Sequence, residues 1–581
     1  MWSPSRQQCV LVAAAALIFF VNLGAARLWD DDEPKNAQCA REMFNRGDWI
    51  VPTFNGDLRC DKPILIYWLM MSAYQVFGDN EFAARLWSAV AAIGTTLATY
   101  HLGRLLFNAR TAFWSGWMMA SSLMFVIAGR AATPDSLMIF FSTLAMLAFV
   151  QATWGRNATL AGANRLADYL PRTWLGYVAM YAAMGVGVLA KGPVVVVLPT
   201  LVLVIYVACV RQALAAPASA PAARRYLRYL SPVAWLVAAW RLRPITALFV
   251  VGAIAVPWYV VVGLQTDGRW LAGFFGQHNV GRYLSPMEGH RGPFWFYVPA
   301  VLFGFFPWST FLPQAVVRTA KLVRQSPSWA AYLFLACWAG TWIGFFSFSG
   351  TKLPSYVTPA YPALAVMTAA WIDAWLAQPS SVSRWFLRQS IVSLGLAGAL
   401  LAIVLPIVAH YLLPGEEVIG LAGLTLLAGI VPAAFWAVSK PQRAAVALAV
   451  AALAFMVSAF GFAAVRASRH QNSAALVDVL RSGDSGYEPA AFDFSTPSLV
   501  YYAHQRVPQF MLADDALKHL QSSPRALVVT DSRRYEELRS RLPGDVAIVA
   551  RRPRFLRTGA IDVVVLGHAG MTAQRTTVKP Y

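Results

Sequence analysis

Charged residues are scarce in this chain, and acidic residues are scarcer than basic ones. Only 13% of the 581 residues are charged, with 28 Asp and Glu against 48 Lys and Arg. Soluble proteins carry about 25% charged residues. Together with a hydrophobic content of 58%, the shortage excludes an ordinary soluble protein and indicates that most of the chain lies in lipid. The net charge of +20 does not predict nucleic-acid binding, because the basic residues form short clusters between apolar runs.

Cysteine is also scarce, and no nucleotide-binding motif is present. Of the five cysteines, Cys39 and Cys60 fall in the first long polar segment. In an oxidising compartment they could form a disulfide worth about 3 kcal/mol, and two unpaired thiols fit the sequence equally well. The cysteine spacing predicts no zinc site. No glycine-rich phosphate-binding motif occurs in the C-terminal part.

Apolar runs near the ~20-residue length that a bilayer requires recur about thirteen times. The predicted spans are 8–26, 83–103, 113–129, 135–153, 174–190, 193–210, 244–263, 297–315, 330–348, 357–376, 390–411, 418–438 and 444–464. With the amino terminus in the cytoplasm, every loop assigned to the inside is basic, as the positive-inside rule requires. The long loops 27–82 and 264–296 then lie outside, and residues 35–47 are expected to form an interfacial helix.

The C-terminal part differs in pattern from the rest of the chain. Runs rich in β-branched residues at 526–530, 547–550 and 562–566 alternate with helical patterns. This alternation predicts a small α/β domain with a parallel sheet. We therefore expect a polytopic α-helical membrane domain over 1–464 and an outer α/β domain over 465–581.

Unusual polar residues gather in the loops assigned to the outer face. Four consecutive carboxylates, 30–33, follow the first apolar run, where burial would be costly without water, a cation or a polar ligand. The other polar residues assigned to this face are Asp61, Lys62, Arg130, Asp135, Lys191, His278, His290, Arg291 and Lys352. Acids and bases collected at one end of a helix bundle favour a functional site.

Several of these residues also have purely structural explanations. Asp135, in Thr-Pro-Asp-Ser, could cap a helix, and Lys191 or Lys352 could simply extend toward lipid headgroups. His278 and His290 could be ordinary hydrogen-bonding residues of loops. Asp61 and His278 could hold a divalent cation, Zn²⁺ or Mg²⁺, but their separation in sequence is weak evidence. We therefore expect metal-free carboxylate chemistry with no required cofactor.

Basic groups at a membrane surface suit a phosphate, and carboxylates suit a developing cation or a proton to be removed. Glycosyl transfer from a lipid-linked phosphosugar needs both, because positive charge develops on the sugar while negative charge develops on the leaving phosphate. A transporter of lipid-linked sugars is the contrasting hypothesis. Its polar site would lie near the membrane midplane, commonly between inverted repeats. Here the polar residues lie at one face and no internal repeat is evident.

Several local motifs of the sequence resemble those of a known enzyme family with this chemistry. The Asp32-Glu33 pair, the run 47–52 beginning Gly-Asp-Trp, and Lys62-Pro63 resemble the first outer loop of GT-C polyprenol-phosphate-sugar glycosyltransferases. The segments 290–299, His-Arg-Gly-Pro-Phe-Trp-Phe-Tyr-Val-Pro, and 350–356, Gly-Thr-Lys-Leu-Pro-Ser-Tyr, narrow the resemblance to bacterial lipid A aminoarabinose transferases. These are related to protein O-mannosyltransferases.

The resemblance implies the fold, the activity and some residue roles. Asp32 matches the family's catalytic acid, Asp135 its second acid, and Lys62 the lysine that contacts the carrier phosphate. We add Glu33 to the catalytic group. The remaining expected contacts are Lys191, Arg130 and Lys352 for the donor phosphate, and Tyr67, Tyr356, His290 and Arg291 for substrate.

The family inverts the anomeric carbon on the periplasmic side of the bacterial inner membrane. It transfers aminoarabinose from undecaprenyl phosphate to a lipid A phosphate, which weakens binding of polymyxin. The resemblance thus implies a lipid-linked donor, a lipid A acceptor, surrounding membrane lipids and no nucleic acid, in a chain that could act as a monomer.

Two departures from the pattern leave the sugar open. Asp61 stands where glutamate is expected, and Asn36 where an aromatic residue often follows the acidic pair. Another polyprenyl-phosphate sugar, or a protein or glycan acceptor, is the alternative.

Overall fold

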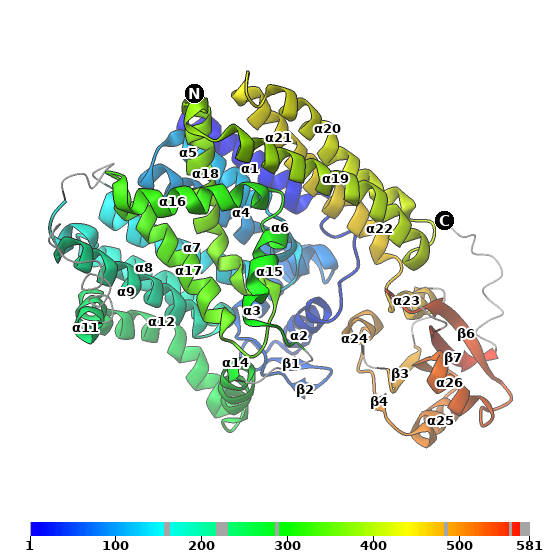
Figure 1. Ribbon diagram of the computed structural model, residues 1–581. Coiled ribbons are helices and arrows are strands. Elements are labelled where there is room, and N and C mark those ends of the chain that lie inside the picture. Colours follow the sequence, from blue (N-terminus) through cyan, green and yellow to red (C-terminus); the bar gives the residue numbers. More distant parts are fainter. Residues whose placement is uncertain are drawn as a thin grey trace.

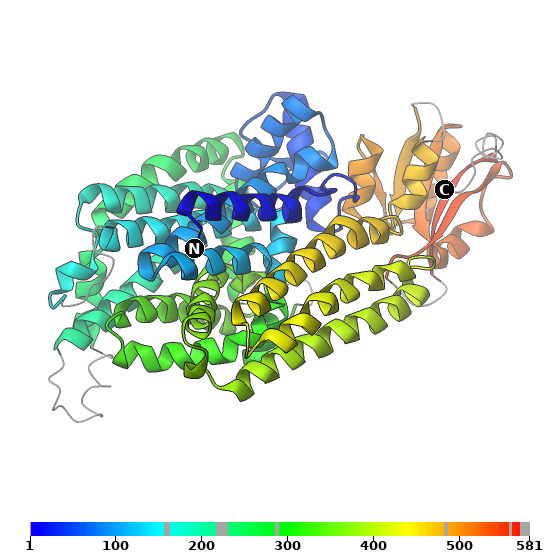
Figure 2. The ribbon, with the colours of Figure 1, turned by 90° about the horizontal axis from the view of Figure 1, so that it is seen from above.

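The computed structural model describes residues 2–155, 163–215, 231–284, 290–481, 486–494, 496–556 and 561–569. Helices dominate these residues, and a small sheet near the carboxyl end lies at one end of the helical bundle (Figure 1). Viewed from above, the long helices run side by side and the sheet, orange to red, lies beyond one end of them (Figure 2). The expected combination of a polytopic helical membrane protein and a small C-terminal sheet region is confirmed.

Nine helices in the described residues are long and apolar enough to cross a membrane, or up to eleven if each of two bent pairs is one span. The bent pairs are α5 with α6, at 62°, and α15 with α16, at 113°. The nine spans comprise α7 (Asp135–Trp154), α8 (Trp174–Lys191), α9 (Val194–Ala215), α12 (Pro244–Gln265), α17 (Trp329–Ser347), α18 (Tyr361–Ala377), α19 (Arg384–Leu412), α20 (Leu421–Trp436) and α21 (Pro441–Met456). The bent pairs comprise α5 (Ala109–Ala120), α6 (Leu123–Arg130), α15 (Tyr297–Gly304) and α16 (Leu312–Gln325).

The other two expected spans coincide with α1 (Pro4–Phe20) and α4 (Glu81–Leu106), which are not among these candidates. Every expected span therefore falls on a helix or a bent pair, but the count of thirteen is not confirmed. α1 has only 17 residues. α4 has 26 residues, among them the buried Thr95, Thr96 and Thr99. The Thr95 and Thr99 hydroxyls donate to the carbonyls of Ala91 and Thr95, each at 2.8 Å. Such self-satisfied hydroxyls can pack inside a bundle.

The first long loop, residues 27–82, folds into short elements that lie over the end of the bundle. A helix is present at the expected position 35–47 as α2 (Asp32–Arg46), and it ends at Gly47 in the left-handed conformation, φ +65°. A hairpin of β1 (Thr53–Phe54) and β2 (Asp57–Leu58) follows, and then α3 (Leu65–Phe77). The residues between the two strands, Asn55 and Gly56, have positive φ, as tight hairpin turns require.

The C-terminal sheet has five strands in the order β4-β3-β5-β7-β6. The strands are β3 (Glu488–Phe492), β4 (Gln509–Phe510), β5 (Ala526–Asp531), β6 (Val546–Pro553) and β7 (Asp562–His568). β3 pairs in parallel with β4 and β5, whereas β7 is antiparallel to both β5 and β6. The expectation of a parallel sheet is therefore wrong for β6 and β7. Only residues 554–561 join these strands, and a parallel connection needs about a dozen residues or more.

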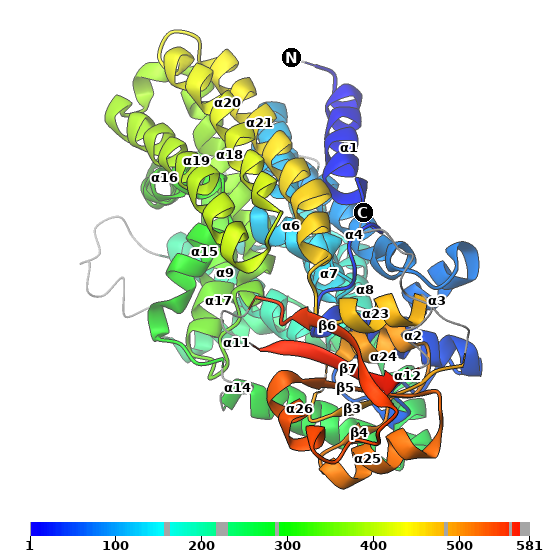
Figure 3. The same ribbon diagram turned by 90° about the vertical axis from the view of Figure 1, so that its right-hand side faces the viewer.

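Side chains near the carboxyl end fasten this sheet region to the first long loop, where α24 (Pro497–Ala503) packs against α2 (Figure 3). The Asp30 carboxylate accepts hydrogen bonds from the backbone N–H of Ser498 at 2.9 Å and from its hydroxyl at 2.6 Å. The Tyr502 hydroxyl accepts from the backbone N–H of Leu28 at 2.9 Å. The segment leading to Asp32 is thus held by residues from the far end of the chain.

Candidate active site

One cavity of about 470 Å³ contains most of the predicted polar residues. Its polar lining includes Asp32, Asp61, Lys62, Asp135, Lys191, His278 and Tyr356. These residues come from the start of α2, the segment before α3, the start of α7, the end of α8, the segment after α12 and the segment before α18. The structure therefore unites residues that lie more than 300 positions apart in sequence.

Two side chains of α2 hold it against the turn that leads into α7. The Glu33 carboxylate accepts the backbone N–H of Ala132 at 2.6 Å. One turn later, the Asn36 side-chain amide donates to the Ala132 carbonyl at 3.0 Å. Asp32 directly precedes Glu33, and Asp135 follows Ala132 by three residues. These bonds therefore bring the two acids to the same cavity.

Glu33, expected among the catalytic acids, does not line the cavity. Its side chain is buried, at 4% exposure, and forms an ion pair with Arg85 through bonds of 2.8 and 2.7 Å. Arg85 also donates to the carbonyls of Leu23 and Ala26. With both oxygens occupied by donors, Glu33 positions the backbone around Asp32.

Asp135 and Lys191 form an ion pair inside the cavity. Asp135 is the first residue of α7 and follows the N-cap residue Pro134. Lys191 is the last residue of α8, followed by Gly192 with φ +84°. Both side chains therefore face the cavity, rather than the helix end or the headgroup region that their structural explanations invoke.

Asp32 lies in a field of positive charge. Burial by surrounding protein raises the pKa of its carboxyl, but Lys62, Lys191, Arg59 and Lys35 together outweigh that effect, so the pKa lies below its ordinary value. The Asp32 side chain remains accessible from the cavity. Asp32 is therefore ionised at neutral pH and open to a ligand.

A buried arginine, Arg59, organises the side of the cavity formed by the first loop. Its guanidinium donates to the Tyr67 hydroxyl at 3.1 Å and to the Asn36 side-chain oxygen at 3.2 Å, and lies 3.4 Å from the Asp61 carboxylate. Trp270 donates its indole N–H to the Arg59 carbonyl at 2.8 Å. Sequence analysis missed Arg59, although its position two residues before Asp61 and three before Lys62 was an available signal.

Asp61 also meets His278, with 3.2 Å between Oδ1 and Nε2. The pair offers two donors of the types that bind Zn²⁺. The described residues contain no group of three or more His, Cys, Asp or Glu able to hold a metal ion. A cation here would need further ligands from substrate or water, and would share Asp61 with Arg59.

The other predicted residues lie outside the cavity lining. Arg130 donates to the carbonyls of Ile18, Val21 and Phe460. Lys352 is 5% exposed and donates to the carbonyls of Phe346 and Ser347. Tyr67 is buried beneath Arg59, while His290 and Arg291 are exposed. Arg130 and Lys352 thus satisfy backbone carbonyls near helix ends, where a cation is favourable.

Apolar residues also line the cavity. They are Val194, Val197 and Leu198 of α9 and Phe274, Phe275, Leu284, Phe345 and Phe346. Sequence analysis did not identify them, because apolar residues are common both in the predicted spans and in the loop 264–296. The cavity thus combines ionised groups with apolar surface.

The structure also decides between a Cys39–Cys60 disulfide and two unpaired thiols. Cys39 and Cys60 are both free thiols. Burial raises the pKa of Cys39 to about 12, despite the nearby positive charge of Arg59. Cys39 is therefore an uncharged packing residue beneath the site.

Comparisons with known proteins agree with this geometry. Residues 8–273 match the family described as dolichyl-phosphate-mannose-protein mannosyltransferase. An undecaprenyl phosphate-α-4-amino-4-deoxy-L-arabinose arabinosyl transferase of Pseudomonas aeruginosa is 31% identical over 400 residues, covering 68% of this chain and 64% of the relative. The corresponding transferase of Photorhabdus laumondii is 28% identical over 377 residues, 63% of this chain and 60% of the relative. The matches thus span about three-fifths of these relatives.

The fold has a solved counterpart over its whole length. The crystal structure of ArnT from Cupriavidus metallidurans bound to undecaprenyl phosphate superposes with a TM-score of 0.75, covering 100% of both chains at 22% sequence identity. The resemblance to GT-C glycosyltransferases, and within them to aminoarabinose transferases, is thereby confirmed, and the chain has their fold.

Proposed function

We propose that this chain is an inverting glycosyltransferase that moves 4-amino-4-deoxy-L-arabinose from undecaprenyl phosphate to a phosphate of lipid A. The transfer would take place in the bacterial inner membrane with the cavity open to the periplasm. Residues 1–464 would form the catalytic membrane domain and 465–581 a periplasmic domain attached to it. Masking a lipid A phosphate with an amine would reduce binding of polymyxin and similar cationic peptides.

The observation that carries this proposal is the cavity in which Asp32, Asp135, Lys62 and Lys191 meet and which apolar side chains also line. A lipid-linked phosphosugar has the same division of chemistry, since its isoprenoid is apolar while its phosphate and sugar are polar. The isoprenoid next to the phosphate would lie along Phe274, Phe345 and neighbouring apolar residues. The phosphate would then be placed beside the two lysines.

Lys62 and Lys191 would stabilise the leaving group. As the bond from the anomeric carbon to the donor phosphate breaks, its electron pair goes to the phosphate oxygen, which gains a negative charge. Fixed ammonium groups in a site partly closed to water stabilise such developing charge strongly. The Asp135–Lys191 ion pair would keep the lysine in place before substrate arrives.

A phosphate oxygen of the acceptor would attack the anomeric carbon from the opposite side, which inverts its configuration. An ionised acceptor phosphate needs no general base. Asp32, held ionised by its cationic neighbours, would stabilise the positive charge that develops on the sugar and accept a proton from an acceptor that carries one. This chemistry requires no cofactor; a divalent cation at Asp61 and His278 would add positive charge beside the phosphates.

The test is transfer by the purified protein in defined lipids. Undecaprenyl phosphate-aminoarabinose and lipid A are supplied, and lipid A is examined by mass spectrometry. We expect a gain of one aminopentose residue, and no gain with Asp32→Asn. Undecaprenyl phosphates carrying other sugars, and peptide or glycan acceptors, are tested in parallel. Transfer only of another sugar, or only to another acceptor, would favour the alternative enzyme. Movement of the donor across the bilayer without transfer would favour the transporter.

A further inference from the structure

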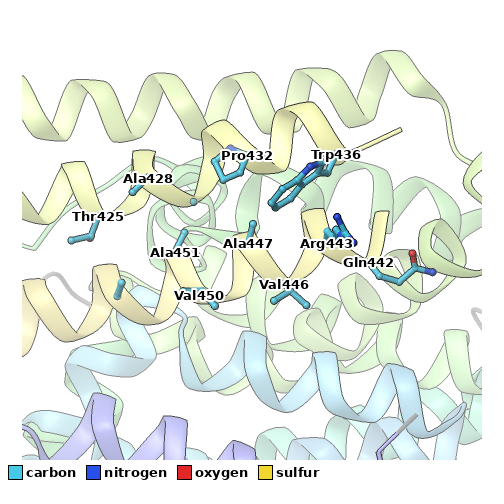
Figure 4. Close-up of a pocket in the computed structure, with 12 residues that line it drawn as sticks. Thr425, Ala428, Pro432, Trp436, Gln442, Arg443, Val446, Ala447, Val450 and Ala451 are labelled. Carbon is cyan, nitrogen blue, oxygen red and sulfur yellow. The ribbon is translucent and has the colours of Figure 1, made fainter. Parts of the chain in front are cut away.

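A second hollow, far from the active-site cavity, lies between α20 and α21. It measures about 880 Å³ and is lined mainly by apolar residues, among them Ala428, Pro432, Val446 and Val450. Figure 4 shows Trp436 of α20 and Arg443 of α21 together at one end of this groove, with Thr425 toward the other. Arg443 is the one charged residue among the described residues that line it.

The Arg443 end of the groove is the end of the bundle opposite the active-site cavity. The indole N–H of Trp375, near the carboxyl end of α18, donates to the carbonyl of Ala437 at 3.3 Å. The other end of α18 begins five residues after Tyr356, which lines the active-site cavity. α18 has 17 residues and is therefore about 25 Å long.

The dimensions of the groove match one leaflet of a bilayer. Along α21 the groove runs from Gln442 to Ala454, and Arg443 lies eleven residues before Ala454. Eleven residues of helix rise about 16 Å, and half of a ~30 Å hydrocarbon core is about 15 Å. An acyl chain of the leaflet whose headgroups lie level with Arg443 would fill the groove.

The polar residues select the headgroup. Arg443 and Gln442 are exposed, and exposed Lys440 lies just before α21. Arginine binds phosphate through two parallel hydrogen bonds, and tryptophan favours the boundary between headgroups and hydrocarbon. No carboxylate lines the groove within the described residues, so none of them would pair with the ammonium of a zwitterionic headgroup.

We propose that the groove between α20 and α21 binds one anionic glycerophospholipid from the leaflet opposite the active site. One acyl chain lies between the helices along Ala428 and Val450, and the phosphate lies at Arg443. This site is independent of the sugar-transfer reaction and of its donor.

The test uses the full chain, delipidated in detergent and titrated with phosphatidylglycerol or phosphatidylethanolamine of identical acyl chains. Native mass spectrometry counts the bound lipids. We expect one phosphatidylglycerol to bind about tenfold more tightly than phosphatidylethanolamine, because both lipids offer a phosphate to Arg443 but only phosphatidylethanolamine brings an ammonium group close to that arginine. Arg443→Ala should abolish this preference and Arg443→Lys should retain most of it. Arg388→Ala is the matched control, because Arg388 is exposed on α19 and does not line the groove.

A second pair of variants tests the apolar part. Ala428→Phe places a ring in the groove and should weaken binding of both lipids. Ala434→Phe adds the same ring at an exposed position of α20 outside the groove and should have no effect. Equal binding of the two lipids by the unmodified chain, or an unchanged preference in Arg443→Ala, would overturn the proposal. A dimer of the chain that dissociates in Ala428→Phe would assign the groove to a second copy and would overturn it as well.

Discussion

Asp32 and Glu33 are adjacent carboxylates with opposite structural roles, and exchanging each for its amide should separate those roles. Glu33 is buried and accepts four hydrogen bonds, from Arg85 twice, from Ala132 and from Trp29. In Glu33→Gln, an amide NH₂ must face some of these donors, and the Arg85 guanidinium loses its counter-charge. Breaking a buried ion pair on one side is destabilising by about 3–5 kcal/mol.

Asp32→Asn removes no comparable contact. Its carboxylate is accessible from the cavity, and the variant amide keeps the shape of the side chain. We therefore expect little change in stability with Asp32→Asn and loss of sugar transfer by about a hundredfold or more, as for removal of one fixed charge at a developing transition state. Glu33→Gln should lower both stability and transfer, because the Ala132 turn before Asp135 loses an acceptor.

The assays are thermal unfolding of the purified protein in detergent and the lipid A transfer assay. A loss of about 4 kcal/mol corresponds to a fall in melting temperature of about 3 °C if the whole chain unfolds together, at about 2.1 cal/mol/K per residue. It corresponds to a larger fall if only part of the chain unfolds. An unchanged melting temperature in Glu33→Gln would refute the structural role of Glu33. A normal transfer rate in Asp32→Asn would refute the catalytic assignment.

Three further predictions use the same assays. Lys191→Met should lower transfer by about a hundredfold, because the leaving phosphate loses a fixed cation. The control is Lys440→Met, which changes an exposed lysine away from the cavity. Equal transfer by the two variants would contradict the role of Lys191 in stabilising the leaving phosphate. Because the pKa of Asp32 is held below its ordinary value of 3.8, the pH profile of kcat/KM should show no loss from its protonation between about pH 5 and 8. An inflection in that range that disappears in Asp32→Asn would contradict this. Burial opposes the charge on His568, but bonds to Asp545 and the Leu520 carbonyl raise its pKa above 6.5. The resulting stabilisation is therefore full below about pH 6.5 and is lost as pH rises through the folded-state pKa. His568→Asn should lower the melting temperature more at pH 5.5 than at pH 8, and an equal change at both would refute the linkage.

Hydropathy predicted the membrane part of the fold well, since each predicted span falls on a helix or a bent pair. Composition could not show the bend at residues 120–123 or the one near 305–311, because bends depend on packing and backbone geometry. In the C-terminal part, the strand-forming runs were visible but the pairing direction of β6 and β7 was not considered. The short connection between them was the available signal.

The candidate site could be predicted in part because its ionised groups are unusual for a membrane protein. Asp32, Lys62, Asp135 and Lys191 stood out for that reason and meet in one cavity. Glu33, Arg130 and Lys352 stood out equally, but their charged groups bond to partners inside the protein. Glu33 accepts the backbone N–H of Ala132, and Arg130 and Lys352 donate to backbone carbonyls. Charge alone does not distinguish a ligand-binding group from one whose partners are internal. The apolar lining carried no signal at all, because hydrophobic residues make up 58% of the chain.

The attachment of Asp30 to Ser498 joins two residues 468 positions apart. During synthesis the acidic segment emerges among the first residues and its partner among the last. For most of the time that the chain is being made and inserted, Arg85 can hold the carbonyls of Leu23 and Ala26, but Leu28 and Asp30 lack their partners Tyr502 and Ser498. The part of the protein that is made last therefore completes the loop that is made first, and a chain that is cut short before α24 would carry every cavity residue while lacking this support for Asp32.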